Sequence, residues 1–446
     1  MSSDLIIRGG LIVRHDSVEI GDLVIDAGKI ADIGTSSNSG RREIDATGLT
    51  IFPGLIDSHV HFNEPGRTEW EGIASGSAAL AAGGGTCFFD MPLNSSPPVL
   101  DGESFDRKQE AASAKSVTDF ALWGGLVPGN LDRLEELAER GVIGFKAFMS
   151  NSGIADFQCV DDLSLYRGME KAMQLGLPVA VHAESEAITS ALSAEIIAKG
   201  RTDIAAYLES RPIVAEVEAI ERAIILCEET GCRLHIVHVS SSRGIELVCR
   251  AAARGTDVTC ETCPHYLALN RHDMERLGAA AKCAPPLRSP NENDKLWQDL
   301  AAGKIAFIAS DHSPSPPEMK SDANFFKVWG GIAGVQSTLP ILLSRAPSLP
   351  LKLVADLVAT NVAQRYRLPE KGRIEIGMDA DLALVDLPGR FELKREHLFD
   401  RHKLSPYVGR TFHGVVKMSL VRGSVVFDNG KVVARNGGRL IKPARP

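Results

Sequence analysis

The stretch that decides the fold is residues 51–61, IFPGLIDSHVH, an apolar segment that ends in two histidines. Residues two apart on a β-strand point to the same side, so we expect His59 and His61 to face one place. Two imidazoles directed at one point form half of a metal site. The remaining ligands must come from other parts of the chain.

The centre of the chain alternates between apolar stretches and stretches compatible with helices. The strand candidates are 51–57, 86–91, 119–126, 141–149, 178–184, 233–240, 257–262 and 305–310. The helix candidates are 72–82, 103–115, 131–140, 161–175, 214–230, 243–254, 292–302, 331–344 and 351–366. Eight strands interleaved with helices predict an α/β fold, a (β/α)8 TIM-like barrel.

The sequence at both ends of the chain predicts short strands joined by tight turns instead of alternating strands and helices. Neither end alone has enough strands for a stable sheet, so we expect the two ends to pair in one small β-sandwich domain. The predicted domains are the N-terminal part of this β-sandwich domain at 1–53, the metal-dependent catalytic barrel at 54–370 and the C-terminal part of the β-sandwich domain at 371–446.

Further polar residues lie at the ends of the predicted barrel strands, or within them. Lys146 lies in strand four, His182 in strand five and His238 in strand six, and Asp311 follows strand eight. Active sites of such barrels lie at the mouth formed by the C-terminal ends of the strands. We therefore expect one site to contain the following residues: His59, His61, Lys146, His182, His238 and Asp311.

This set of residues predicts two metal ions. Four histidines and Asp311 exceed what one tetrahedral zinc needs, and two neighbouring metals require a bridging ligand. A free ammonium repels cations, but a desolvated lysine has a lowered pKa, and its neutral amine adds carbon dioxide to form a carbamate. Carboxylated Lys146 is then a bidentate anion that can bridge both metals. Sites of this kind accept zinc, cobalt, manganese or iron.

The expected chemistry is the hydrolysis of an unreactive amide. Two metals acidify a bridging water to hydroxide near neutral pH, and a metal polarises the scissile carbonyl. Asp311 is the expected catalytic residue, since it can accept the proton of the water and pass it to the leaving nitrogen.

Other residues with chemical potential have simpler interpretations. His235 lies an odd number of residues from His238 and is expected to face the other side, in a structural role. His265 and His312 adjoin the site in the sequence and are expected either to support ligands or to be structural. Cys260 and Cys263 form a single C-x-x-C pair, which cannot complete a zinc site and is interpreted as buried thiols.

Composition narrows the class of partner. The net charge of −8 over 446 residues disfavours nucleic acid and anionic membranes, and a small-molecule substrate is expected. No stretch approaches the roughly 18 apolar residues of a membrane span, and the first residues do not read as a signal peptide. Eight scattered cysteines are typical of a reducing compartment. We therefore expect a cytoplasmic protein.

With these residues the chain resembles the amidohydrolase superfamily, specifically its cyclic amidohydrolases. The resemblance covers nearly the whole chain and includes IRGG at 7–10, FPGLIDSH at 52–59 and the barrel residues above. It implies a homotetramer and a binuclear centre, usually of zinc, with carboxylated Lys146 as the bridge. It also implies which ligands hold each metal: His59, His61 and Asp311 for one, and His182 and His238 for the other.

Two positions separate the branches of this superfamily. Dihydroorotases place an arginine where this chain has Asn63, and dihydropyrimidinases and hydantoinases place a tyrosine where it has Asn151. The stretches 63–72, 310–320, 329–337 and 401–410 instead resemble the allantoinase family.

That resemblance implies hydrolysis of the hydantoin ring amide of allantoin to allantoate. It also implies that the ring meets backbone groups near Cys283 and Gly330, while Asn63 and the loop that follows it, together with Asn151, are the expected polar contacts. A hydantoinase or dihydropyrimidinase acting on other 5-substituted cyclic ureides is the alternative. A non-catalytic scaffold protein of this fold would lack metal ligands, and all six are present here.

Overall fold

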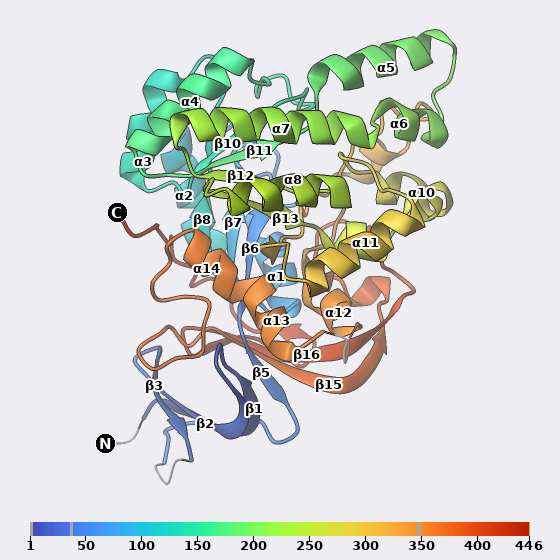
Figure 1. The fold of residues 1–446 in the computed structure, drawn as a ribbon. Coiled ribbons are helices and arrows are strands. Elements are labelled where there is room, and N and C mark those ends of the chain that lie inside the picture. The colour runs from blue at the N-terminus through green and yellow to red at the C-terminus, as the bar shows by residue number, and fades with distance from the viewer. Residues whose placement is uncertain (1–2, 36–38, 346–348, 446) are drawn as a thin grey trace.

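Parallel strands in the middle of the chain form a (β/α)8 barrel with helices on its outside (Figure 1). This computed structural model describes residues 3–35, 39–345 and 349–445. The barrel strands are β6 (Leu55–Val60), β7 (Gly85–Asp90), β8 (Asp119–Leu122), β9 (Gly124–Gly125), β10 (Phe145–Phe148), β11 (Val179–His182), β12 (Leu234–Ile236), β13 (Val258–Thr262) and β14 (Phe307–Ile308). β8 pairs with β7 and β9 with β10, so these two pieces share the third strand position. The predicted barrel is confirmed.

The barrel closes between its first and last strands. Val60 forms a parallel bridge with His312, and the His61 N–H donates to the His312 carbonyl over 2.8 Å. At the entry to β6, a Cβ on Gly54 would lie 2.3 Å from the Thr86 side chain, so only glycine permits this close packing. Closure brings the end of β6 beside the segment that carries Asp311.

Most helices fall where the sequence predicts them. They are α1 (Ile73–Ala82), α2 (Gly102–Lys115), α3 (Leu134–Arg140), α4 (Asp162–Gln174), α5 (Glu186–Ala198), α6 (Ile204–Ser210), α7 (Ile213–Thr230), α8 (Ser242–Ala253), α9 (Pro264–Ala268), α10 (Arg271–Leu277), α11 (Pro290–Ala301), α12 (Thr338–Leu343), α13 (Leu351–Ala355) and α14 (Asn361–Arg365). The segment predicted as a helix over 331–344 is helical only from Val335, because residues 329–334 form a loop directed to the barrel mouth. A π-helical turn, Asp356–Thr360, joins α13 to α14.

Both ends of the chain supply one small β-domain below the barrel in Figure 1. Its strands are β1 (Leu5–Val13), β2 (Val18–Asp26), β3 (Lys29–Gly34), β4 (Glu43–Asp45), β5 (Thr50–Pro53), β15 (Leu382–Glu392), β16 (Thr411–Val421), β17 (Ser424–Asp428) and β18 (Lys431–Val432). The two halves join where β5 pairs antiparallel with β15. The predicted β-sandwich domain built from both termini is confirmed.

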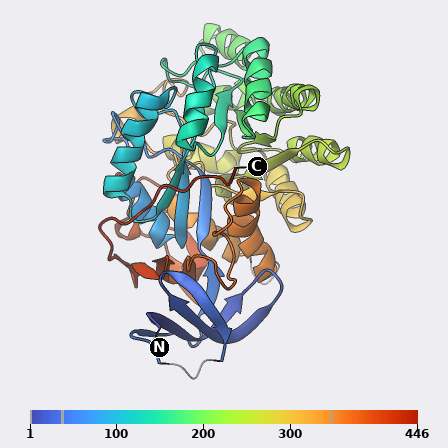
Figure 2. The same ribbon diagram turned by 90° about the vertical axis from the view of Figure 1, so that its left-hand side faces the viewer.

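The last residues return from this domain to the base of the barrel (Figure 2). The Ile441 N–H donates to the Phe120 carbonyl over 2.7 Å, and the Phe120 N–H donates to the Arg439 carbonyl over 3.0 Å. The segment after residue 371 therefore also contacts β8, and the domain limits at 53/54 and 370/371 stay predictions.

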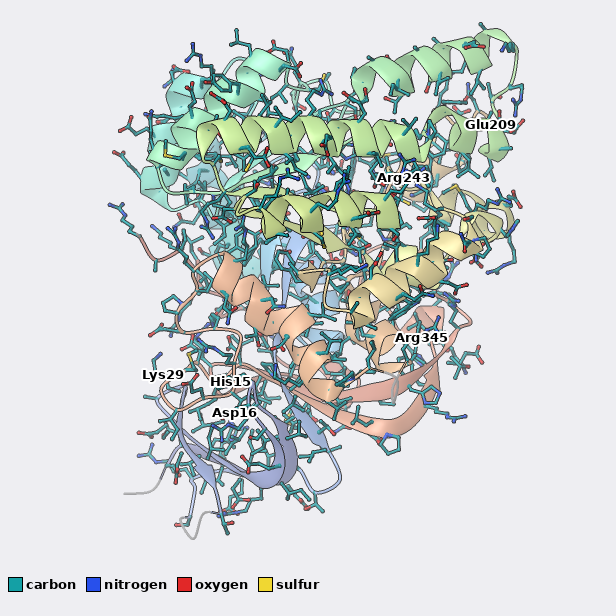
Figure 3. The ribbon with its side chains drawn as sticks, in the orientation of Figure 1. His15, Asp16, Lys29, Glu209, Arg243 and Arg345 are labelled. Atoms are coloured by element: carbon teal, nitrogen blue, oxygen red, sulfur yellow. The ribbon has the colours of Figure 1, made fainter. Side chains whose placement is uncertain are left out.

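The two parts of the molecule are distinguished in Figure 3 by Lys29, in the small β-domain, and Glu209, on α6 beside the barrel. Lys29 pairs with Glu370 at 2.9 Å and with Asp379 at 3.1 Å, so it links β3 to the segment between α14 and β15. Within the described residues, none of the helices has the combination of length and apolar character that a membrane crossing needs.

Candidate metal centre

Three ligand atoms converge where β6 meets the end of β14. The Nε2 atoms of His59 and His61 lie 3.3 and 3.5 Å from Asp311 Oδ1. Asp311 follows β14 in a left-handed conformation, with φ of +46°, which is rare for a residue with a side chain. Such local strain is typical of functional sites. The three side chains form one candidate group for a metal ion, as predicted from the sequence.

A second pair of ligands lies beside the first group. His182 ends β11, and His238 follows β12 in another left-handed conformation, with φ of +40°. His182 Nδ1 lies 3.0 Å from His238 Nε2. The ring of His238 is 5.5 Å from that of His59, so the pair and the first group share one site. The structure thus brings the four predicted histidines and Asp311 together.

Lys146 lies in β10 with its amine fully buried. Its Nζ has no hydrogen-bond partner among the described residues and lies 5.0 Å from the centre of the Phe148 ring. Burial lowers the pKa of this amine to about 7, although the negative charges of Glu261 and Asp311 favour the ammonium. An orphaned buried amine with a low pKa fits a lysine that becomes a carbamate. The residues present therefore fit a metal centre with a lysine-derived bridge.

Glu261 orients His59 from behind. Its carboxylate accepts hydrogen bonds from His59 Nδ1 at 2.7 Å, from Ser58 Oγ at 3.0 Å and from His235 Nε2 at 3.1 Å. Burial opposes its ionisation, but the hydrogen bonds from His235 and His59 hold the pKa of Glu261 well below its usual range. With the proton on Nδ1, His59 presents the lone pair of Nε2 to the site. His235 is not a ligand, but it supports one through Glu261.

Glu184 orients His182 in the way that Glu261 orients His59. Its carboxylate accepts from His182 Nε2 at 2.9 Å and pairs with Arg211. Burial would raise the pKa of Glu184, but the charge of Arg211 and the hydrogen bond from His182 lower it to about 2. His182 therefore turns the lone pair of Nδ1 toward His238.

Asn94 is a further contact of a ligand that sequence reasoning missed. Its side-chain amide lies 3.3 Å from His61 Nδ1. The nearer amide atom is Nδ2. When His61 binds a metal through Nε2, Nδ1 carries the proton, and the amide of Asn94 must then turn its oxygen toward Nδ1 to accept the hydrogen bond. The signal that could have found Asn94 is its position just after β7, at the same mouth as the ligands.

A cavity of about 80 Å³ opens over these ligands. Most predicted site residues line it: His59, His61, Asn151, His182, His238, Cys283, Asp311 and Gly330. Asn63 does not line it; it is buried with φ of +64°, and its amide donates to the Pro314 carbonyl at 3.4 Å.

His265 and His312, whose roles the sequence left undecided, have different surroundings in the structure. His312 Nδ1 accepts from the N–H groups of Gly334 and Val335 at 3.1 and 3.3 Å, so it anchors the loop beside the cavity. His265 is buried, and neither ring nitrogen has a partner among the described residues. The thiols of Cys260 and Cys263 are buried and free, in agreement with their interpretation.

A second acidic cluster lies at the base of the barrel and is already neutralised. Asp119, Asp379 and Asp381 surround Lys371 Nζ at 2.6, 2.9 and 2.6 Å. The three carboxylates raise the pKa of Lys371 against the effect of burial. This cluster is an ion-pair network that joins the barrel to the segment before β15.

The fold and this arrangement of ligands define a class of metal-dependent hydrolases. The chain matches the Amidohydrolase family over residues 50–431 and belongs to it. Membership implies the binding of divalent metal, in accordance with the ligand groups above.

Within the family, the chain is 55% identical over 446 residues to an allantoinase of Rubrobacter xylanophilus, covering 99% of this chain and 98% of that protein. It is 49% identical to an allantoinase of Deinococcus radiodurans, covering 99% of each chain. Among solved structures, the L-hydantoinase (dihydropyrimidinase) of Arthrobacter aurescens superposes with a TM-score of 0.96 at 34% identity, covering 99% of this chain and 100% of that one.

Proposed function

We propose that this protein is an allantoinase, which hydrolyses the hydantoin ring amide of allantoin to give allantoate. The observation that carries the proposal is that four histidines and Asp311 line one cavity, with Lys146 buried in β10, in a chain about half identical to allantoinases over nearly its full length. Asn63 and Asn151 stand where related cyclic amidohydrolases acting on other rings have an arginine or a tyrosine.

We propose that two divalent metals, zinc in the first place, occupy the site. His59, His61 and Asp311 would hold one, His182 and His238 the other, and carboxylated Lys146 would bridge them. When bound, such metals lower the pKa of water and polarise a carbonyl. The desolvated amine of Lys146 supports the carbamate, because only the neutral amine reacts with carbon dioxide.

Asp311 is the proposed catalytic residue. Burial would raise its pKa, but the neighbouring His59 and His61 lower it to about 2, so the carboxylate is ionised at neutral pH. It can accept a proton from the attacking water and release it to the ring nitrogen as the C–N bond breaks. Its position on the wall of the cavity gives it access to both.

Substrate binding is proposed to rely on backbone groups at Cys283 and Gly330, which line the cavity. Asn151 lines the cavity too, where it can meet the ureido arm. Asn63 is buried below the loop that follows β6, so its proposed contribution is to set that loop. Unchanged kinetics on allantoin in Asn63→Ala would remove it from the site.

The test compares turnover of allantoin, hydantoin and dihydrouracil by one preparation, with metal content measured in parallel. We expect kcat/KM to be highest for allantoin. Faster turnover of hydantoin or dihydrouracil would instead favour a hydantoinase or dihydropyrimidinase. In Lys146→Ala we expect both the bound metal and the activity to be lost, and full activity in this variant would refute the bridging role.

We further propose a homotetramer in the cytoplasm. Light scattering of the purified protein tests the assembly, and fractionation of cells tests the location. A monomer or a dimer at micromolar concentration would contradict the tetramer.

A further inference from the structure

Two lysines, the buried Lys282 and the half-buried Lys320, lie in the loops that border the cavity, and both contact backbone carbonyl groups. Lys320 ends a 3-10 turn, Pro317–Lys320, and its Nζ donates to the carbonyl oxygens of Ala279 at 3.2 Å, Trp329 at 3.1 Å and Gly331 at 2.6 Å. These acceptors belong to two segments far apart in the sequence. Lys320 therefore joins the segment before Cys283 to the loop after β14.

Lys282 makes a second junction between the same loops. Its Nζ donates to the carbonyl oxygens of Phe325 at 2.6 Å and Val328 at 2.5 Å. Its own carbonyl accepts from the Gly331 N–H at 2.8 Å. A Cβ placed on Gly330 would lie 4.0 Å from the Lys282 side chain, so the lysine passes directly behind the cavity wall.

The next residue, Cys283, is held from the other side. Its carbonyl accepts from the Tyr207 hydroxyl at 2.9 Å, and the Tyr207 ring lies 4.5 Å from Lys282 Nζ, a cation–π contact. Tyr207 belongs to α6, on the outside of the barrel (Figure 1). The backbone on both sides of Lys282 is thereby fixed.

The contacts of Lys320 require its charged form. Lys320 has three carbonyl acceptors, which match the three N–H groups of an ammonium, whereas a neutral amine would turn its lone pair toward one of the oxygens. Burial lowers the pKa of both amines to about 7. Among the described residues, neither lysine forms an ion pair with a carboxylate, so the dipoles of three peptide groups are what stabilise the charge of Lys320.

The charge acts on a group that faces the substrate. Lys320 binds the carbonyl oxygen of Trp329, and the N–H at the other end of the same peptide unit belongs to Gly330, which lines the cavity. This N–H donates to no acceptor within the described part of the chain. Hydrogen bonds in series polarise one another, so the ammonium makes the Gly330 N–H a stronger donor.

We propose that Lys320 and Lys282 are positioning residues that fix and polarise the backbone at Cys283 and Gly330, where the ring amide of the substrate binds. Neither lysine touches the metal ligands or the reacting atoms. The proposal rests on the proposed function only in taking a cyclic ureide as the substrate. In this proposal the segment Pro317–Lys320 contributes to substrate binding without touching the substrate. It does so through the Lys320 ammonium, which holds the backbone of the cavity wall.

The test is steady-state kinetics of the metal-loaded enzyme with Lys320→Met, Lys282→Met and Lys320→Arg. Wild type is first assayed on allantoin, hydantoin and dihydrouracil, and the variants are then compared on whichever ring it hydrolyses best. The proposed substrate can thus fail while the positioning role is still tested. We expect KM to rise about tenfold in both methionine variants, with kcat within about twofold and metal content unchanged, because a binding contact is lost. Lys320→Arg should recover most of the affinity.

Arg233→Met is the matched control, since Arg233 also donates to a backbone carbonyl, that of Arg365, but at the base of the barrel. We expect it to lower the melting temperature without changing KM. A wild-type KM in folded Lys320→Met would overturn the proposal, and so would an equal rise in KM in Arg233→Met. If Lys320→Met does not fold, Lys282→Met and Lys320→Gln give the same comparison.

Discussion

Replacing Glu261 by glutamine tests whether the residues behind the ligands set metal affinity. The carboxylate accepts three hydrogen bonds, from Ser58, His59 and His235. A glutamine has one acceptor oxygen, so its NH2 group must face at least one of these donors. Each hydrogen bond to a charged group contributes about 1.5–3 kcal/mol to stability. The substitution therefore removes at least one such bond and leaves His59 without a fixed tautomer.

The expected effect on the metal follows from this geometry. Loss of a carboxylate that orients a ligating histidine weakens metal binding about 10–100-fold. The measurement is metal content after competition with a chelator of known affinity, together with the melting temperature of the apo protein. We expect bound metal to be lost at a chelator concentration at least tenfold lower than in the wild type.

Glu216→Gln provides the control. Glu216 is a buried carboxylate that accepts from the Ser240 N–H at 2.7 Å and the Ser240 hydroxyl at 2.8 Å, but it contacts no ligand. We expect this variant to lose stability and keep its affinity for metal. Equal affinity in Glu261→Gln and wild type would refute the reasoning, and so would equal losses in both variants.

Three further substitutions test other parts of the structure. In Gly331→Ala a new Cβ would lie 2.1 Å from a carbonyl oxygen of the loop after β14, so kcat/KM should fall at least about tenfold, while Gly129→Ala, where the space is open, should be silent in the same assay. Arg211→Met leaves Glu184 buried without its cation, so titration with metal should show one of two sites weakened about tenfold, and two equal sites would contradict this. Within the described residues, Lys371→Met leaves Asp381 without a cation, and Asp119 and Asp379 with only Arg422 and Lys29, at the base of the barrel. It should cost about 3–5 kcal/mol in urea unfolding, with unchanged activity per folded, metal-loaded chain; a lower kcat would contradict the separation of base and mouth.

The candidate ligands could be grouped from the sequence because their pattern is local. His59 and His61 are two residues apart on one strand, and the alternation of side chains fixes their common direction. His182, His238 and Asp311 lie at strand ends, and a closed barrel gathers all strand ends at one mouth. The prediction needed no knowledge of how the loops fold.

The supporting carboxylates carry a weaker signal that could have been used. Glu184 lies two residues after His182, and Glu261 is a charged residue inside the mostly buried strand β13. Each is a charged residue in a buried segment. A buried charge needs a specific partner, so such a residue indicates an interaction. The sequence does not say which histidine each one meets, because that depends on the register of neighbouring strands.

Contacts between side chains and backbone carbonyl groups cannot be predicted from the pattern of residue types. Residues 331–334 were predicted to begin a helix, but they belong to the loop at 329–334, whose path depends on the carbonyl groups that Lys282 and Lys320 bind. Every residue carries a carbonyl group, so no residue type marks the acceptor. Asn63 shows the same limit, since its position after His61 suggested a substrate contact but its left-handed backbone turns the side chain to the Pro314 carbonyl.

The buried lysines of this protein show how partners, rather than burial, decide what a buried amine does. Desolvation acts against the charge of all of them. Lys146 has no hydrogen-bond partner among the described residues, its pKa falls to about 7, and the neutral amine is free to react. Lys371 is surrounded by three carboxylates that raise its pKa and make it an ion-pair anchor. Lys282 and Lys320 have the same lowered pKa of about 7, but their amines donate to backbone carbonyl groups, whereas Lys146 has no acceptor in the described part of the chain. These hydrogen bonds join the loop at 329–334 to the segment at 279–283, a role that an apolar side chain could not fill.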